Sequence, residues 1–81
     1  MPNKIDIYKM LCEGIKEVKG ADYTEDEIVK KTFWDLGVDS LEFIKLVVFL
    51  ETKSGLTVGD ELLAFADRSV EDFTANLVAN N

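Results

Sequence analysis

The sequence predicts a small all-α protein, and three observations lead to that fold class. The chain of 81 residues is long enough for one domain and too short for two. Hydrophobic residues make up 47% and charged residues 31%, a composition typical of globular domains and unlike that of disordered chains. Apolar residues recur at three- and four-residue spacing, and no alternating stretch indicates a strand. We therefore expect residues 1–81 to form a single domain, a small four-helix bundle of three main helices and one short helix with a long first loop.

The first helix is expected over residues 4–19. Gly14 lowers its intrinsic stability, and Gly20 is a natural C-terminal stop. Its core-facing side chains are predicted from their helical spacing to be Ile5, Tyr8, Leu11, Cys12, Ile15 and Val18.

The long connection over residues 20–38 is expected to contain a short helical turn at residues 25–30. Thr24 and Glu27 form a capping-box pattern in front of it. Three apolar side chains further along are expected to pin the loop onto the helices: Phe33, Trp34 and Leu36. Trp34 is predicted to pack rather than to stack on nucleic-acid bases, because the accompanying basic residues are missing.

The second main helix is expected from residue 40 to about residue 53. Asp39 is its predicted N-cap and Glu42 the matching acid of a capping box. One apolar face is predicted to consist of Leu41, Ile44, Val47 and Val48, with Phe43, Leu46 and Leu50 extending it. The helix is therefore expected to be mostly buried. Its narrow outward stripe, directly below Ser40, is predicted to be Glu42, Lys45 and Phe49.

The rest of the chain predicts two further helices. Gly55 ends the second main helix, a short apolar helix follows at residues 60–66, and Ser69 is a cap-like start for a last helix reaching about Ala79. The inward side chains of that last helix are predicted to be Val70, Phe73, Leu77 and Val78. Residues 80–81 are expected to fray.

Charge is unevenly distributed along the chain. The net charge is −7. Residues 21–42, which lie just before and at the Ser40 junction, hold seven acids against two lysines, a net charge of −5. Such a field repels nucleic acid and anionic membranes and steers basic protein surfaces toward the same place. The chain begins with an amphipathic pattern, and its longest apolar run, residues 46–50, is too short to span a bilayer. We expect a cytoplasmic monomer.

The residue inventory excludes much catalytic and metal chemistry. There is no histidine and only one cysteine, so neither a Ser-His couple nor a Cys/His zinc site can form within the chain. Cys12 is expected to be a small buried hydrophobe. The acids around residues 22–27 lack the alternating ligands and glycine of an EF-hand loop, which predicts a solvated acidic face and no metal site. The chain is not expected to be an enzyme.

Ser40 is the candidate functional residue. It lies at the predicted junction of a loop and a helix, where free backbone N–H groups and the helix dipole favour a phosphate. Its surroundings lack the Gly-x-Ser-x-Gly elbow of a hydrolase nucleophile, and no histidine can take its proton. Ser40 is therefore expected to be the acceptor in a reaction that another enzyme catalyses.

The run Leu36-Gly37-Val38-Asp39-Ser40-Leu41 closely resembles the Leu-Gly-x-Asp-Ser-Leu motif of acyl carrier proteins, and the likeness in helix order extends over essentially the whole chain. The resemblance implies that a phosphopantetheinyl transferase attaches 4'-phosphopantetheine to Ser40. The thiol of that arm would carry acyl groups as thioesters between enzymes of fatty-acid, lipid or polyketide-type biosynthesis. It also implies that Asp39, Leu41 and Glu42 contact partners, namely acyl-transferring or acyl-activating enzymes and synthases with basic docking patches.

Four residues depart from the family pattern. Lys45 and Thr52 stand where fatty-acid carriers usually have acids. Phe43 stands where a small or hydroxylated residue is common, and Phe49 where a small residue is common. The two rings either fill space or reshape the acyl cavity and the docking face. Lys45 and Phe49 are therefore added to the predicted partner-recognition residues, and the protein is expected to be a specialised discrete carrier. Two alternatives stay open at this point: an aminoacyl or peptidyl carrier, and an unmodified acidic helical adaptor in which Ser40 is only part of a cap.

Overall fold

A computed structural model describes residues 2–81, the side chain of Leu63 excepted. Its helices follow in the order α1 (Lys4–Lys19), α2 (Glu25–Val29), α3 (Ser40–Ser54), the 3₁₀ helix η1 (Asp60–Asp67) and α4 (Val70–Ala79). The described chain forms no strand, and its one isolated β-bridge joins Thr32 to Ser69. The predicted all-α fold of three main helices and shorter ones is confirmed.

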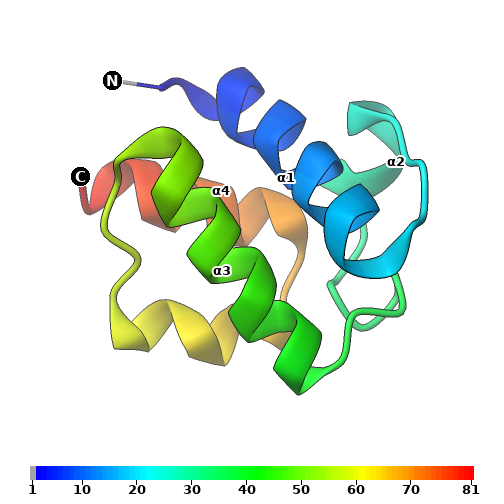
Figure 1. The fold of residues 1–81 in the computed structure, drawn as a ribbon. Coiled ribbons are helices and arrows are strands. Elements are labelled where there is room, and N and C mark those ends of the chain that lie inside the picture. Colours follow the sequence, from blue (N-terminus) through cyan, green and yellow to red (C-terminus); the bar gives the residue numbers. More distant parts are fainter. Residues whose placement is uncertain (1) are drawn as a thin grey trace.

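The helices pack around one core (Figure 1). α1 and α3 make the most extensive contact of any pair, α2 packs against α1, and α4 contacts α1, α2 and η1. In Figure 1, α1 and α3 lie side by side and run in opposite directions, α4 lies behind them, and η1 runs along the lower edge. Within residues 2–81, no helix combines the length and the apolar character that crossing a bilayer requires.

Local capping determines where the helices begin and end. Asn3, Thr24 and Asp39 each accept a hydrogen bond from the third residue of their helix, and the acid at that third position bonds back to the cap, which completes three capping boxes. Gly20 and Gly55 end α1 and α3 with left-handed φ angles of 72° and 73°. The bounds predicted for these elements are therefore confirmed within a residue or two.

The core stripe of α1 differs from the prediction at its first position. Ile7, Leu11 and Ile15 are buried, whereas Ile5 is 59% exposed. Ile5 lies about 120° around the helix from Leu11, so it cannot share that residue's inward face. The prediction that Ile5 belongs to the core was wrong.

Gly14 lies at the contact between α1 and α3. A Cβ atom at Gly14 would collide with Cδ1 of Leu46 and would lie 2.9 Å from Cδ1 of Phe49. Both contacts would be shorter than van der Waals contact, so a larger residue here would have to displace these two side chains. The sequence indicated only that Gly14 weakens the helix and gave no sign of this packing role.

Three aromatic rings join the loop before α3 to two helices. Phe33, Phe43 and Phe73 are buried, and their ring centroids lie 5.0, 5.3 and 5.9 Å apart in tilted or edge-to-face pairs. Phe43 is thus a core residue. Its ring fills space in the core, which is one of the two roles that the sequence left open for it. The predicted inward residues Val70, Phe73 and Leu77 of α4 are buried as well.

The C-terminal end is held by side-chain hydrogen bonds, contrary to the expectation that residues 80–81 fray. The Asn81 amide nitrogen donates to the carbonyl oxygens of Thr57 and Leu77, at 3.0 and 2.9 Å, and its oxygen accepts from the Thr57 N–H at 3.1 Å. An amide side chain carries both donors and an acceptor, so it can bond a neighbouring backbone segment in both directions.

We predict that Gly14→Ala lowers the free energy of unfolding by about 1–2 kcal/mol. Alanine favours a helix by about 1 kcal/mol over glycine, but overpacking against the buried Leu46 costs more than that gain. Chemical denaturation measures the difference. In a Leu46→Ala background the contact with Leu46 is gone and only the one with Phe49 remains, so the same change should cost less; an equal loss in both backgrounds would refute the packing role of Leu46.

We predict that Cys12 reacts slowly with alkylating reagents. The side chain is half-buried, and burial raises the pKa of its thiol to about 11, with the carboxylates of Glu25 and Glu27 adding to the rise. Because only the thiolate reacts, alkylation near pH 8 should be roughly tenfold slower than for a free cysteine, after allowing for the higher nucleophilicity of a more basic thiolate. Mass spectrometry of timed iodoacetamide reactions measures the rate, which should still be rising at pH 10. A rate equal to that of free cysteine would contradict the burial of this thiol.

Candidate functional site

The turn that leads to Ser40 is built from local hydrogen bonds. The Asp35 N–H donates to the Thr32 hydroxyl at 3.0 Å, and the Thr32 N–H donates back to the Asp35 carboxylate at 3.3 Å. The N–H groups of Gly37 and Val38 then donate to the carbonyl oxygens of Trp34 and Phe33, each at 3.0 Å. The Thr-x-x-Asp pattern at residues 32–35 is a recognisable cap signal that the sequence analysis did not use.

Gly37 closes this turn with a φ angle of +79°, in the left-handed region that glycine adopts without strain. Leu36 and Val38 on either side of it are 3% and 1% exposed, so they anchor the loop to the core as predicted for Leu36. The Val70 N–H donates to the Lys31 carbonyl oxygen at 2.8 Å, which ties the beginning of the turn to α4. The backbone before α3 is therefore fixed at both ends.

Ser40 is the first residue of α3 and is exposed. Asp39 is the N-cap, as predicted, and its carboxylate accepts a 2.8 Å hydrogen bond from the Glu42 N–H. The remaining N–H groups of the first turn and the positive end of the helix dipole make this end of α3 favourable for a phosphate.

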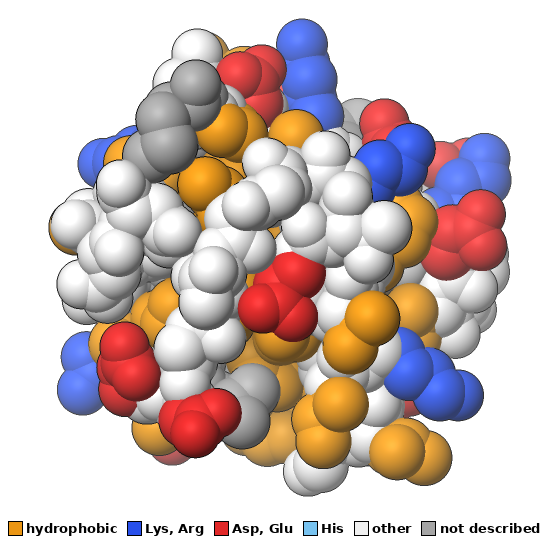
Figure 2. All heavy atoms as spheres, turned by 60° about the vertical axis from the view of Figure 1, so that its left-hand side comes forward, with side chains coloured by type: hydrophobic (Ala, Val, Ile, Leu, Met, Phe, Trp, Pro, Cys, Tyr) orange, Lys and Arg blue, Asp and Glu red, His pale blue; other side chains and the backbone are white. Residues whose placement is uncertain are grey.

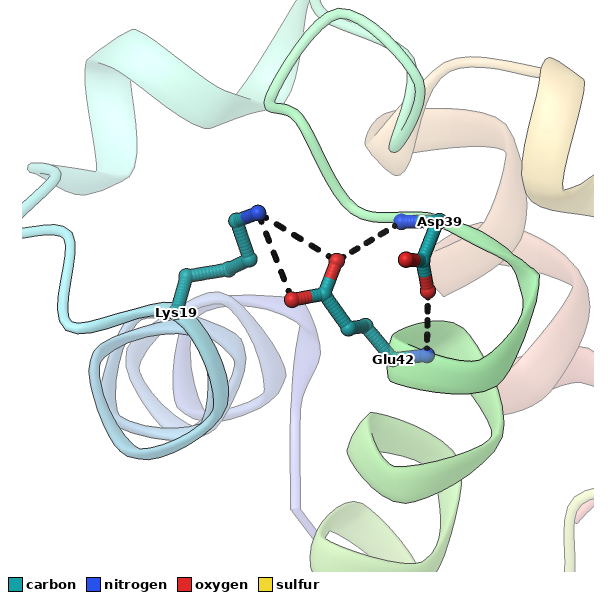
Figure 3. A network of polar contacts seen from close by, with 3 residues as sticks. All are labelled: Lys19, Asp39 and Glu42. Carbon is teal, nitrogen blue, oxygen red and sulfur yellow. Dashed lines mark hydrogen bonds and ion pairs between the residues drawn. The ribbon is translucent and has the colours of Figure 1, made fainter.

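A three-residue polar network supports this helix start (Figure 3). The Glu42 carboxylate accepts a 3.0 Å hydrogen bond from the Asp39 N–H, and both of its oxygens lie 3.3 Å from Nζ of Lys19. Lys19 is in the last turn of α1, so the ion pair connects the end of one helix to the beginning of another. The two side chains are only 29% and 21% exposed, which screens the pair less than a fully exposed one.

The predicted outward stripe of α3 was wrong for two of its three residues. Glu42 is turned to Lys19, and Phe49 is half-buried where α1 crosses at Gly14. Lys45 is exposed, as predicted. The cause is the crossing with α1, which covers the side of α3 on which Glu42 and Phe49 lie.

Three of the four residues predicted for the core face of α3 lie outside the core. Leu41, Ile44 and Val48 are 64%, 51% and 56% exposed. The buried side chains are the fourth, Val47, and the three predicted to extend that face, Phe43, Leu46 and Leu50. Apolar residues surround this helix, so its spacing allowed either rotation about the helix axis, and the Gly14 crossing and the aromatic cluster select one. Figure 2 shows hydrophobic side chains gathered on the lower right of the molecular face that it draws, next to a basic one.

A small cavity of about 160 Å³ opens beside Ser40. It is lined by Trp34, Ser40, Phe43, Ile44 and Ala66, which come from the loop, from α3 and from η1. Trp34 was expected to pin the loop onto the helices by packing; it lies at this cavity with Ile44 and Ala66 but is 44% exposed, because Phe33 and Leu36 take the inward positions of the turn. The serine thus stands at the rim of a mainly apolar hollow.

No group of three or more acidic or cysteine side chains in the described chain is arranged to hold a metal ion. The exposed hydroxyl, the helix N-terminus and the adjacent hollow fit a phosphate group attached to an extended apolar or weakly polar chain. The chain has no histidine that could act as a base at this site.

We predict that Lys19→Met lowers the free energy of unfolding by about 0.5–1 kcal/mol, because it removes a partly shielded partner of Glu42. Denaturation in low and high salt measures the loss, which salt should reduce. Lys16→Met is the matched control: Lys16 pairs with Asp22 at 3.7 Å, but both side chains are well exposed, so that change should have almost no effect. Equal losses in the two variants would show that the Lys19 contact does not support α3.

Comparisons with known proteins agree with this geometry. A family model described as a phosphopantetheine attachment site matches residues 11–77, most of the chain. Searches of curated proteins and of solved structures each gave no significant match. The chain therefore belongs to the family of phosphopantetheine-binding, acyl-carrier-type domains, which hold 4'-phosphopantetheine covalently on a serine.

Proposed function

We propose that Ser40 is the serine that receives 4'-phosphopantetheine and that the protein carries acyl groups on this arm. The chain has three serines. Ser54 donates to the Leu50 carbonyl oxygen at 2.7 Å in a half-buried position, and Ser69 caps α4. Within residues 2–81, no hydrogen bond engages the Ser40 hydroxyl, which is exposed at a helix start. This free hydroxyl is the observation that carries the proposal.

The attachment reaction requires little of the chain itself. The Ser40 oxygen attacks the phosphorus of coenzyme A that bears the pantetheine, the bond to the bridging oxygen breaks, and adenosine 3',5'-bisphosphate leaves. The hydroxyl proton passes to a base of the transferase, since this chain has no histidine to accept it. The new phosphodiester lies at the positive end of α3, where the helix dipole stabilises its charge.

The residues around Ser40 would position the arm. Trp34, Ile44 and Ala66 give the neighbouring hollow an apolar lining against which the arm or its cargo can lie. The thiol of the bound arm supplies the thioester bond to the acyl group. The chain presents that thiol and is not itself a catalyst. Fatty-acid, lipid and polyketide-type biosynthesis use such carriers, and the Asp39-Ser40-Leu41 triplet together with the acidic balance favours acyl cargo.

Carrier domains of this family interact with a phosphopantetheinyl transferase and with the enzymes that use the arm. We propose that basic groups of these enzymes face the loop side of the site, where Asp35 and Asp39 are exposed next to Ser40. We further propose that the protein acts as a cytoplasmic monomer. Its single thiol is consistent with a reducing compartment.

We predict that incubation with coenzyme A, Mg²⁺ and a promiscuous phosphopantetheinyl transferase adds the mass of one arm to the protein. Intact-protein mass spectrometry should show complete addition to the unaltered chain and none to Ser40→Ala. Ser54→Ala is the matched control and should be modified like the unaltered chain, since its hydroxyl is bonded within α3. Absence of any mass change in the unaltered chain, or addition to Ser40→Ala, would refute the proposal.

An aminoacyl or peptidyl carrier is the second candidate, because the exposed charged residues of α3 are Lys45 and Lys53 and the family model does not separate the two carrier types. Loading of the modified protein decides between them. Acceptance of a fatty acid from an acyl ligase supports the acyl carrier, and acceptance of an amino acid from an adenylating enzyme supports the alternative.

A further inference from the structure

We propose that the enzymes which use the arm dock on an apolar stripe of α3 and place a carboxylate against Lys45, in place of a basic patch along this helix. The stripe consists of Leu41, Ile44 and Val48. The inference deepens the proposed function and rests on it, because it takes the docking partners to be the enzymes that act at Ser40.

The stripe is a continuous exposed surface. Its three side chains are each more than half exposed, and they follow one another at positions three and four residues apart, so they lie on one face over about 10 Å of helix. Five large hydrophobic side chains are exposed in the described chain, and three of them belong to this stripe. Apolar side chains gathered in this way on a small domain mark a surface that a partner covers.

The two carboxylates of α3 are already engaged by groups within the chain. Glu42 is bonded to Lys19 and to the Asp39 N–H, and Oε2 of Glu51 accepts a 3.1 Å hydrogen bond from the Val58 N–H. Both side chains are only partly exposed. Although the whole protein has a net charge of −7, α3 presents no exposed carboxylate to a partner.

The exposed charges of α3 are both positive. Lys53 lies 3.7 Å from the Glu13 carboxylate and 5.8 Å from the centre of the Phe49 ring, so it is engaged on the α1 side. Lys45 forms no ion pair with any residue of the described chain. A basic partner surface opposite Lys45 would be repelled, and a carboxylate would be attracted. The partner surface is therefore expected to carry a carboxylate at this position.

The stripe also continues directly into the attachment site. Leu41 follows Ser40 in sequence, and Ile44 lines the hollow beside Ser40. An enzyme covering the stripe would therefore have its active-site entrance next to the arm. Basic groups opposite the acidic loop and an apolar, acid-bearing groove along α3 would together fix the orientation of the carrier.

Two helical peptides test the proposal on the protein with and without its arm. They share one leucine stripe and differ only in flanking charges, glutamate in one and arginine in the other. The readout is the shift of backbone amide signals of the ¹⁵N-labelled protein, in about 0.15 M salt so that charges farther than about 8 Å away are screened. The glutamate peptide should shift residues 40–48, and the arginine peptide should shift the acidic segment 21–39 instead.

Variants in matched pairs identify the contacts. Lys45→Glu should weaken binding of the glutamate peptide about two- to fivefold, the range for an exposed charge pair, and Lys9→Glu on α1, with the same change of net charge, should leave it unaltered. Val48→Thr, a nearly isosteric change that preserves the helix, should weaken binding of the glutamate peptide at α3 about threefold. Ile5→Thr, at the other exposed isoleucine, should not.

Three results would overturn the proposal. They are binding of the arginine peptide rather than the glutamate peptide at residues 40–48, an unchanged affinity in Lys45→Glu, and self-association of the free protein through the stripe seen as concentration-dependent line broadening. Failure of arm attachment at Ser40 is a separate outcome, because peptide binding is also measured on the unmodified chain. Such a failure would refute the proposed function and leave the chemistry of the stripe established.

Discussion

The crossing of α1 and α3 at Gly14 determines how α3 is rotated about its own axis. Because Gly14 has no side chain, Leu46 and Phe49 can approach the α1 backbone more closely than a Cβ atom would allow. That approach places Phe43, Leu46 and Leu50 inward. The same rotation turns Glu42 toward Lys19 and leaves the stripe of Leu41, Ile44 and Val48 facing solvent. A single small residue on one helix thus decides which surface another helix shows to its partners.

A second set of contacts determines where α3 begins. The rings of Phe33, Phe43 and Phe73 hold the preceding loop against α3 and α4, and the hydrogen bond from the Val70 N–H to the Lys31 carbonyl oxygen fixes the beginning of the same loop. The capping box and the Lys19 ion pair then satisfy backbone and carboxylate groups at the helix start. These contacts hold the Ser40 hydroxyl in one place, as the proposed attachment reaction requires.

Local features of this protein could be predicted from its sequence, and features that depend on contacts between distant residues could not. The caps at Thr24 and Asp39 and the glycine stops at Gly20 and Gly55 act within one helical turn, so their residue types alone predicted the helix bounds. The site motif around Ser40 is equally local. The rotation of α3 is not, because apolar residues surround this helix and the choice between two faces is made by Gly14, which is 26 residues before Ser40. Trp34 illustrates the same limit, since Phe33 beside it occupied the inward position.

The reactivity of the half-buried Cys12 thiol affects whether the proposed arm retains a group that is bound to it as a thioester. Thioester exchange between two thiols is close to thermoneutral, so a reactive cysteine on a carrier could take the acyl group from its own arm. Burial and the neighbouring carboxylates keep Cys12 protonated at neutral pH, and a protonated thiol is a poor nucleophile. Cys12 is therefore expected to exchange slowly with a thioester carried on the proposed arm.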